Sequence, residues 1–146
     1  MPDDIPLGVL MFIAYRAMDD RAFTAVAEAA HHDITRAQAK LLQRVNDDGS
    51  RLSELADAAQ VTKQTAGYLV DQLESAGYVE RVPDPTDARA RLVRMTGRAR
   101  ELLPIGGIAV AEVEAEWTAH LGRRRMEQLR DILTCLREIT DPFLER

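Results

Sequence analysis

The stretch LSELADAAQVTKQTAGYLVDQLESAGYVERV, residues 52–82, decides the fold of this chain. Apolar residues recur at three- and four-residue intervals in two successive segments, 52–59 and 63–76, which predicts two short amphipathic helices. Thr62 is the expected N-cap of the second helix, and Gly77 suits the left-handed position just past its end. Two short helices with a tight connection between them are typical of a helix-turn-helix motif.

A hairpin is predicted directly after the second helix. Residues 79–82 and 92–95 alternate in polarity and predict two strands, with a polar, proline-rich tip over 83–90. A helix, a helix-turn-helix and a hairpin in this order predict a winged helix. In such a fold the second helix of the motif enters the major groove of DNA, and the hairpin reaches along the backbone to a neighbouring minor groove.

The start of the second helix then faces the base edges. The residues concerned are Thr62, Lys63, Gln64 and Thr65, with Tyr68 one turn further along. Lysine can bond phosphate or guanine, glutamine can pair with adenine through two hydrogen bonds, and threonine can bond bases or phosphates. An ordinary solvated helix start is the alternative interpretation of the same residues.

Another amphipathic helix is predicted before this motif, over 7–29, and the His-His-Asp sequence at 31–33 ends it. Thr35 and Gln38 then form a capping box, in which each side chain satisfies a free backbone N–H of the other residue. The helix that they begin is expected to reach about Val45.

Helical periodicity returns after the hairpin. Apolar residues predict helices over 102–121 and 126–143, and Gly122 separates them. Pro104 deletes a backbone hydrogen bond and the pair at 106–107 consists of two glycines, so we expect a kink there.

The composition excludes several protein classes. The chain has 146 residues and is 46% hydrophobic, which suffices for one domain with a packed core. The single cysteine, Cys135, excludes an internal disulfide scaffold, and its place beside an apolar stripe indicates packing rather than redox sensing. The apolar segment 5–18 follows aspartates and is too short to span a membrane, so we expect a cytoplasmic protein without membrane contact.

No motif of enzyme chemistry is present. The sequence has no glycine-rich phosphate loop, no Gly-x-Ser-x-Gly turn and no cysteine paired by motif with histidine. Glu116 and His120 could share a metal ion, but two ligands do not make a site. We therefore expect no catalytic residue, no metal and no cofactor. A helical hydrolase or metalloprotein is kept only as a third hypothesis.

The charge distribution is more informative than the total charge. The formal net charge of −5 argues weakly against nucleic-acid binding. However, five arginines follow one another without an intervening acidic residue: Arg89, Arg91, Arg94, Arg98 and Arg100. A basic face on an acidic body is therefore expected.

Several motifs together carry a family resemblance: LSELA (52–56), VTKQT (61–65), VDQLESAGYVER (70–81), and the hairpin sequences DPTDAR (84–89) and LVRMTGR (92–98). They resemble the MarR (multiple antibiotic resistance regulator) family of winged-helix transcription factors. The hairpin is the most specific part, because it resembles that family's Asp-x-Arg wing and closing Leu-Thr-x-x-Gly segment.

The resemblance implies both fold and function. The implied fold class is mainly α (α+β), a winged helix-turn-helix core with a two-stranded wing, flanked by N- and C-terminal dimerisation helices. Within one domain, 1–146, residues 1–33 are the N-terminal dimerisation helix, 34–98 the DNA-binding core and 99–146 the C-terminal dimerisation helices. The implied function is that of a homodimeric repressor that binds a pseudo-palindromic operator in double-stranded DNA.

The resemblance also assigns roles within the wing. Arg89 would enter the minor groove, where its charge gains from the negative potential, and Asp87 would hold it. Arg91 and Arg94 would contact phosphate, or merely solvate the hairpin.

Relatives in this family are often released from DNA by a small aromatic or phenolic effector. By resemblance, its pocket would lie between the dimerisation helices and the winged core, with Phe12, Tyr15 and Arg16 as candidates for effector binding.

Three positions depart from the family pattern. Gly67 and Tyr68 stand where relatives commonly carry a small hydroxyl residue and then arginine, and Gln72 stands where arginine is frequent. Together with the acidic net charge, they motivate an alternative: a winged-helix protein–protein interaction module without DNA binding.

Overall fold

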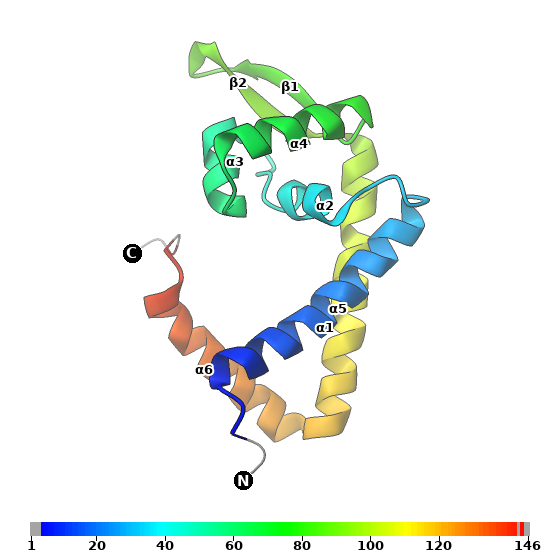
Figure 1. Cartoon of the computed structure of the whole chain (residues 1–146), viewed down its shortest axis with the longest axis vertical. Helices are drawn as coiled ribbons and strands as arrows, with labels where there is room; N and C mark the ends of the chain where they lie inside the picture. Colours follow the sequence, from blue (N-terminus) through cyan, green and yellow to red (C-terminus); the bar gives the residue numbers. More distant parts are fainter. Residues whose placement is uncertain (1–3, 143, 145–146) are drawn as a thin grey trace. The chain divides into compact units, whose positions relative to one another are not determined.

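A computed structural model describes residues 4–142 and 144 of the chain (Figure 1). Its elements are α1 (Leu7–Ala29), α2 (Arg36–Leu42), α3 (Leu52–Ala59), α4 (Lys63–Ser75), β1 (Val79–Asp84), β2 (Asp87–Met95), α5 (Gly97–Leu121) and α6 (Arg123–Thr140). The predicted fold class is confirmed, because a two-stranded wing follows a helix-turn-helix between N- and C-terminal helices. Within the described residues, no helix combines the length and the apolar character needed to cross a membrane.

The chain forms two compact units, and the boundary falls inside α5, between Ala109 and Val110. The first unit holds α1, the winged core and the first half of α5. The second unit holds the remainder of α5 and α6.

Helix α4 is at the centre of the winged core, and α2, α3 and β1 pack against it. Its inward residues are all buried: Ala66, Leu69, Val70 and Leu73. Leu55 of α3 is also completely buried. This spacing of three and four residues leaves the opposite face of α4 exposed to solvent.

The end of α4 has the predicted left-handed glycine. Gly77 has a φ of +81°, a conformation that costs residues with a side chain more than glycine. Its N–H donates to the Glu74 carbonyl at 3.0 Å, and the Tyr78 N–H donates to the Leu73 carbonyl at 2.9 Å. These two bonds form a Schellman motif, which ends the helix and directs the chain into β1.

The wing strands are longer than predicted. They pair antiparallel from Val79 opposite Met95 to Pro83 opposite Arg91, with an irregularity after Pro83. The predicted tip over 83–90 was therefore wrong, and only residues 85–86 lie between the strands. Proline is tolerated because a two-stranded hairpin has free edges and this residue adjoins a bulge, where no N–H is needed.

A short bridge attaches the wing to the core. Ser50 donates its N–H to the Val93 carbonyl at 2.9 Å and accepts the Val93 N–H at 2.8 Å. The Ser50 side chain also accepts the N–H of Asn46 at 2.9 Å. The segment 46–50 thus brings Ser50 beside β2.

The first two helices begin as predicted. Helix α1 has the expected bounds, and both His31 and His32 just beyond it have positive φ. The capping box of α2 is confirmed: Gln38 donates its N–H to Thr35 Oγ1 at 3.2 Å, and Thr35 donates its N–H to Gln38 Oε1 at 3.0 Å.

Helix α2 ends earlier than predicted, at Leu42 rather than near Val45. The N–H groups of Arg44 and Val45 bond the carbonyls of Leu41 and Leu42, three residues back. Such bonds tighten the chain beyond the α-helical geometry. The apolar stripe nevertheless continues, since Val45 is buried.

Helix α5 begins at Gly97, before the predicted start, and continues without a break through Pro104 and the glycine pair. The kink stays a prediction, because a continuous helix can still bend there. A Cβ at Gly106 would lie 3.2 Å from Val26 Cγ2, so this glycine permits a close approach of α1. Gly122 separates α5 from α6 as predicted, while Phe143, the expected end of α6, lies outside the described residues.

Candidate nucleic-acid interface

The start of α4 is exposed and firmly capped. Thr62 Oγ1 accepts the N–H of Thr65 at 3.1 Å and donates to Thr65 Oγ1 at 3.0 Å. Lys63 and Gln64 follow the cap and are exposed. The positive end of the helix dipole lies here, so backbone and side chains together attract phosphate. The structure thus brings the four predicted residues at the start of this helix together.

Tyr68 lies one turn further along the exposed face of α4. It is 63% exposed, so it does not belong to the packed core. Gln72 Nε2 donates to its hydroxyl at 2.9 Å. An aromatic ring that stays in solvent beside the helix start can contact a ligand laid along this face.

The base of the wing turn is held by a buried carboxylate, Asp84. Its Oδ1 accepts the N–H and the hydroxyl of Thr86, at 2.8 and 2.7 Å, and its Oδ2 accepts Nε and Nη2 of Arg51, at 3.0 and 2.8 Å. The hydroxyl and N–H of Thr86, with the Arg51 guanidinium, lower the pKa of Asp84 below its usual range. The hydrogen bond to Asp84 raises the pKa of Arg51. A charged network therefore attaches the wing turn to the N-terminus of α3.

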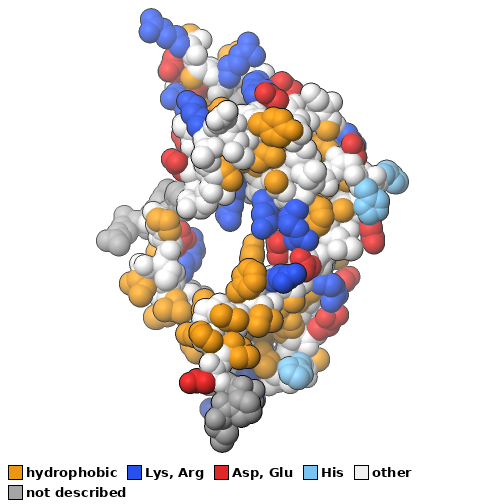
Figure 2. Space-filling view, in the orientation of Figure 1, with side chains coloured by type: hydrophobic (Ala, Val, Ile, Leu, Met, Phe, Trp, Pro, Cys, Tyr) orange, Lys and Arg blue, Asp and Glu red, His pale blue; other side chains and the backbone are white. Residues whose placement is uncertain are grey.

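The predicted wing residues Asp87 and Arg89 are joined by a hydrogen bond to the backbone. Asp87 Oδ1 accepts the N–H of Arg89 at 3.0 Å. Within residues 4–142 and 144, no ion pair holds the guanidinium of Arg89 or that of Arg91, and both side chains are exposed. Figure 2 shows basic side chains at the tip of the wing, at the top of the view. Two cations are thus available to a ligand there.

The other arginines of the basic run have internal partners. Arg94 Nη2 lies 2.7 Å from Glu80 Oε1 across the hairpin. Arg98 stacks over the ring of Tyr78 at 4.2 Å, bonds the Ala76 carbonyl and pairs with Asp33. The expected basic face therefore narrows to the wing tip and the start of α4.

The effector candidates lie together on the N-terminal half of α1. Phe12 and Tyr15 are 58% and 59% exposed. Arg16 Nε lies 3.8 Å from Asp20 Oδ2, one turn away on the same helix. The three candidates are therefore grouped on one exposed segment of α1.

The sequence also singled out Glu116 with His120, and Cys135. In the part of the chain that the structure describes, no three histidine, cysteine or carboxylate side chains gather as metal ligands. Cys135 is exposed on α6 rather than covered within the single chain.

Sequence reasoning missed Arg51, Asp84 and Gln38 as residues that support this surface. Their partners lie 33 or 34 residues away in the chain, so no local spacing indicates them. The Asp-Pro-Thr sequence at 84–86 was the one available signal, because aspartate commonly accepts the N–H of the residue two positions later.

The comparisons with known proteins agree with this geometry. The family model for the MarR family matches residues 32–90. Transcriptional regulator HosA of Escherichia coli O111:H- is 30% identical over 100 residues, which cover 65% of this chain and 71% of that protein.

Solved structures extend the similarity over most of the chain. The apo form of MarR from E. coli is 26% identical, with a TM-score of 0.74 over 92% of this chain and 98% of that one. A Mycobacterium tuberculosis MarR family protein, solved in complex with salicylic acid, is 25% identical, with a TM-score of 0.67 over 93% and 99%.

Proposed function

Because the chain belongs to the MarR family of winged-helix transcriptional regulators, we propose that it acts as a homodimeric repressor at a pseudo-palindromic operator. It is a DNA-binding transcriptional regulator and not an enzyme. The interaction module without DNA binding is thereby set aside. Such a regulator acts where the chromosome lies, so we place it in the cytoplasm.

The observation that carries the proposal is the pair of exposed basic elements in the winged core. Lys63 stands at the capped start of α4, and Arg89 and Arg91 stand at the wing tip. We assign Lys63, Gln64 and Thr65, with the cap residue Thr62 and Tyr68, to the major groove, and Arg89 to the minor groove. Arg91 is assigned to phosphate, while Asp87 shapes the loop that presents Arg89.

Dimerisation is supported by apolar surface on the terminal helices. On α1, Leu7, Phe12 and Ile13 are 71%, 58% and 54% exposed, and Figure 2 shows hydrophobic side chains gathered in the lower part of the view. On α6, Ile132 and Ile139 are 59% and 82% exposed. Apolar surface of this extent on a helix is typical of an interface. A twofold partner would cover these faces and set the spacing of two α4 helices.

The proposal also includes the release of the repressor from DNA by a small effector. One structural relative was solved with salicylic acid, an aromatic acid with a phenol. We propose that a small aromatic effector binds near Phe12 and Tyr15, with Arg16 available for its carboxylate. The effector would release DNA only by binding more tightly to the dimer whose α4 spacing does not fit the operator.

Selection of bound duplexes from a random DNA pool tests the function. An inverted repeat with half-sites about one helical turn apart is the expected product. If Lys63 and Arg89 in their grooves and Arg91 on the backbone each neutralise about one phosphate charge per subunit, the logarithm of the affinity should fall with the logarithm of salt concentration at a slope of about −5. Recovery of no duplex, or of a site without symmetry, would contradict the proposal.

A further inference from the structure

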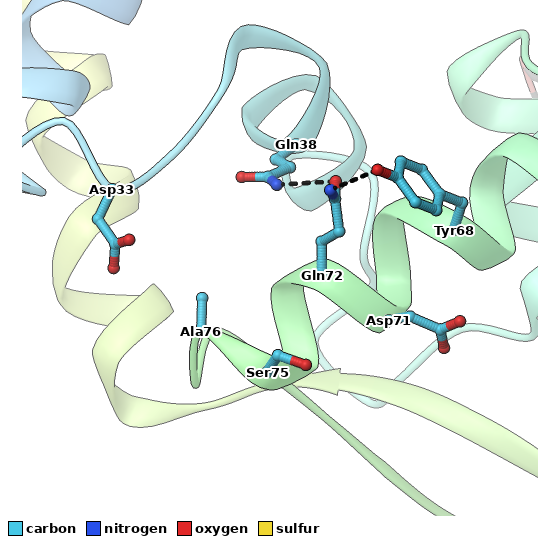
Figure 3. A pocket seen from close by; sticks show the side chains of 7 residues that line it. All are labelled: Asp33, Gln38, Tyr68, Asp71, Gln72, Ser75 and Ala76. Carbon is cyan, nitrogen blue, oxygen red and sulfur yellow. Dashed lines mark hydrogen bonds between the residues drawn. The ribbon is translucent and has the colours of Figure 1, made fainter.

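A chain of polar side chains leads from the capping box of α2 to the exposed ring of Tyr68. Gln38 Nε2 donates to Gln72 Oε1 at 3.0 Å, and Gln72 Nε2 donates to the Tyr68 hydroxyl at 2.9 Å. Figure 3 shows the three side chains in line from α2 to α4. They border a surface hollow of about 570 Å³ on the outer side of α4.

The direction of every bond in this chain follows from one group. The backbone N–H of Thr35 can only donate, and it donates to Gln38 Oε1 at 3.0 Å. Gln38 therefore turns its amide nitrogen toward Gln72, which must meet it with the carbonyl oxygen. The amide nitrogen of Gln72 is then left for Tyr68, whose hydroxyl has to accept.

An accepting hydroxyl keeps its own proton for another partner. Tyr68 is exposed on the face of α4 that carries Lys63 and Gln64, so this proton is offered outward. We propose that Gln38 and Gln72 are positioning residues that hold the Tyr68 hydroxyl as a hydrogen-bond donor to an acceptor atom of DNA. This rests on the proposed function, because it requires α4 to face DNA.

The acceptor is a phosphate oxygen or an acceptor atom on a base edge. Phosphate oxygens only accept, and most protein contacts to DNA are made to the backbone. On base edges the same donor would select guanine O6 or N7, adenine N7 or thymine O4. In either case Tyr68 contributes one hydrogen bond, whereas the arginine that is common at this position in relatives would also contribute charge attraction.

Gln38→Glu tests this assignment without altering a residue that faces DNA. A glutamate at 38 still accepts the Thr35 N–H, but its second oxygen also accepts, so Gln72 must turn its nitrogen inward. The oxygen of Gln72 then takes the Tyr68 proton, and the outward donor is lost. The matched control is Gln43→Glu, which adds the same charge at an exposed position at the end of α2.

The measurement is the affinity of each variant for the duplex that the wild-type protein recovers from a random pool. Tyr68→Phe should weaken binding about tenfold per subunit, the lower value for one hydrogen bond to a charged acceptor. Gln38→Glu should weaken it to a similar extent, and Gln43→Glu less than twofold. The double variant, Gln38→Glu with Tyr68→Phe, should be no weaker than Tyr68→Phe alone, because both changes remove the same donor.

Duplexes with single methylphosphonate linkages distinguish the two acceptors. If a phosphate is the partner, neutralising it should weaken the wild type but not Tyr68→Phe. If a base edge is the partner, the two proteins should differ at one base pair instead. Either result supports the donor.

Three results would overturn the assignment. They are unchanged affinity of Tyr68→Phe, additive losses in the double variant, and equal losses for Gln38→Glu and its control. If Gln38→Glu does not fold, Gln72→Glu removes the same outward donor, because its carboxylate still accepts from Gln38 Nε2 and must also accept the Tyr68 proton. Ser75→Glu is its charge control. A wild-type protein that binds no duplex would refute the proposed function, an outcome separate from these.

Discussion

The contact between α1 and α5 can be tested by two neighbouring glycines that differ in one respect. A Cβ at Gly106 would lie 3.2 Å from Val26 Cγ2, whereas a Cβ at Gly107 would meet nothing within 4 Å. Both residues lie inside the same continuous helix. Substitution by alanine therefore changes helix propensity equally and changes packing at only one position.

The magnitudes follow from these two environments. Gly107→Ala should stabilise the protein by about 1 kcal/mol, the propensity difference between glycine and alanine in a helix. Gly106→Ala gains the same amount, but the crowded methyl costs about 1–3 kcal/mol. Val26 is buried and β-branched on a helix, so it cannot rotate away easily. We expect Gly106→Ala to be destabilising by about 1 kcal/mol, and thus about 2 kcal/mol less stable than Gly107→Ala.

The assay is urea unfolding at one fixed protein concentration, because the stability of a dimer depends on concentration. Adding Val26→Ala to Gly106→Ala removes the crowding partner and should reveal a favourable coupling between the two sites. Equal stabilisation by both glycine substitutions, or an absence of coupling, would refute the close approach of α1 and α5.

Three further predictions concern the wing and the dimer. Arg89→Ala should weaken operator binding by about 1–3 kcal/mol, and Arg94→Ala, whose guanidinium is paired with Glu80, should weaken it less; filter binding compares the two. The pKa of Asp84 is lowered in the folded state, so its ionised carboxylate stabilises the wing at pH values above the ordinary aspartate pKa of about 3.9. This stabilisation is lost as the pH falls below that value. The midpoint temperature of thermal unfolding should accordingly fall less steeply with acidification for Asp84→Asn than for the wild type. Ile139→Asp should give a folded monomer by sedimentation, since the wild-type side chain is 82% exposed in the single chain, and an intact dimer would contradict the role of α6.

Local chemistry explains which parts of the fold the sequence could predict. The capping box of Thr35 and Gln38 and the left-handed Gly77 each depend on residues within five positions, and both are present. The sequence predicts wing strands that are too short, because proline in such a segment is typical of a turn. The tolerance of Pro83 depends on its position at a bulge in a hairpin with free edges, which only the paired strand defines.

The supporting residues of the candidate site illustrate the opposite case. The sequence predicts Gln38 as half of a capping box, but its amide nitrogen also donates to Gln72 Oε1, 34 residues further along. Gln72 was noted only because arginine is frequent there in relatives. Its function as a link to Tyr68 requires α2 and α4 to be packed together, and no periodicity within either helix encodes that distance.

The net charge misleads for the same reason. Counting residues gives −5, yet acidic groups beside the interface are paired with arginines of the winged core, which offsets most of their charge. Arg81 pairs with Asp71 at 2.7 Å and with Glu74 at 2.9 Å, and Arg94 pairs with Glu80 at 2.7 Å. What a ligand meets is the remainder after this pairing, which is cationic at the wing tip and at the start of α4. An acidic chain can thus present a basic surface to DNA, because the partners of its charges decide the local field more than their sum does.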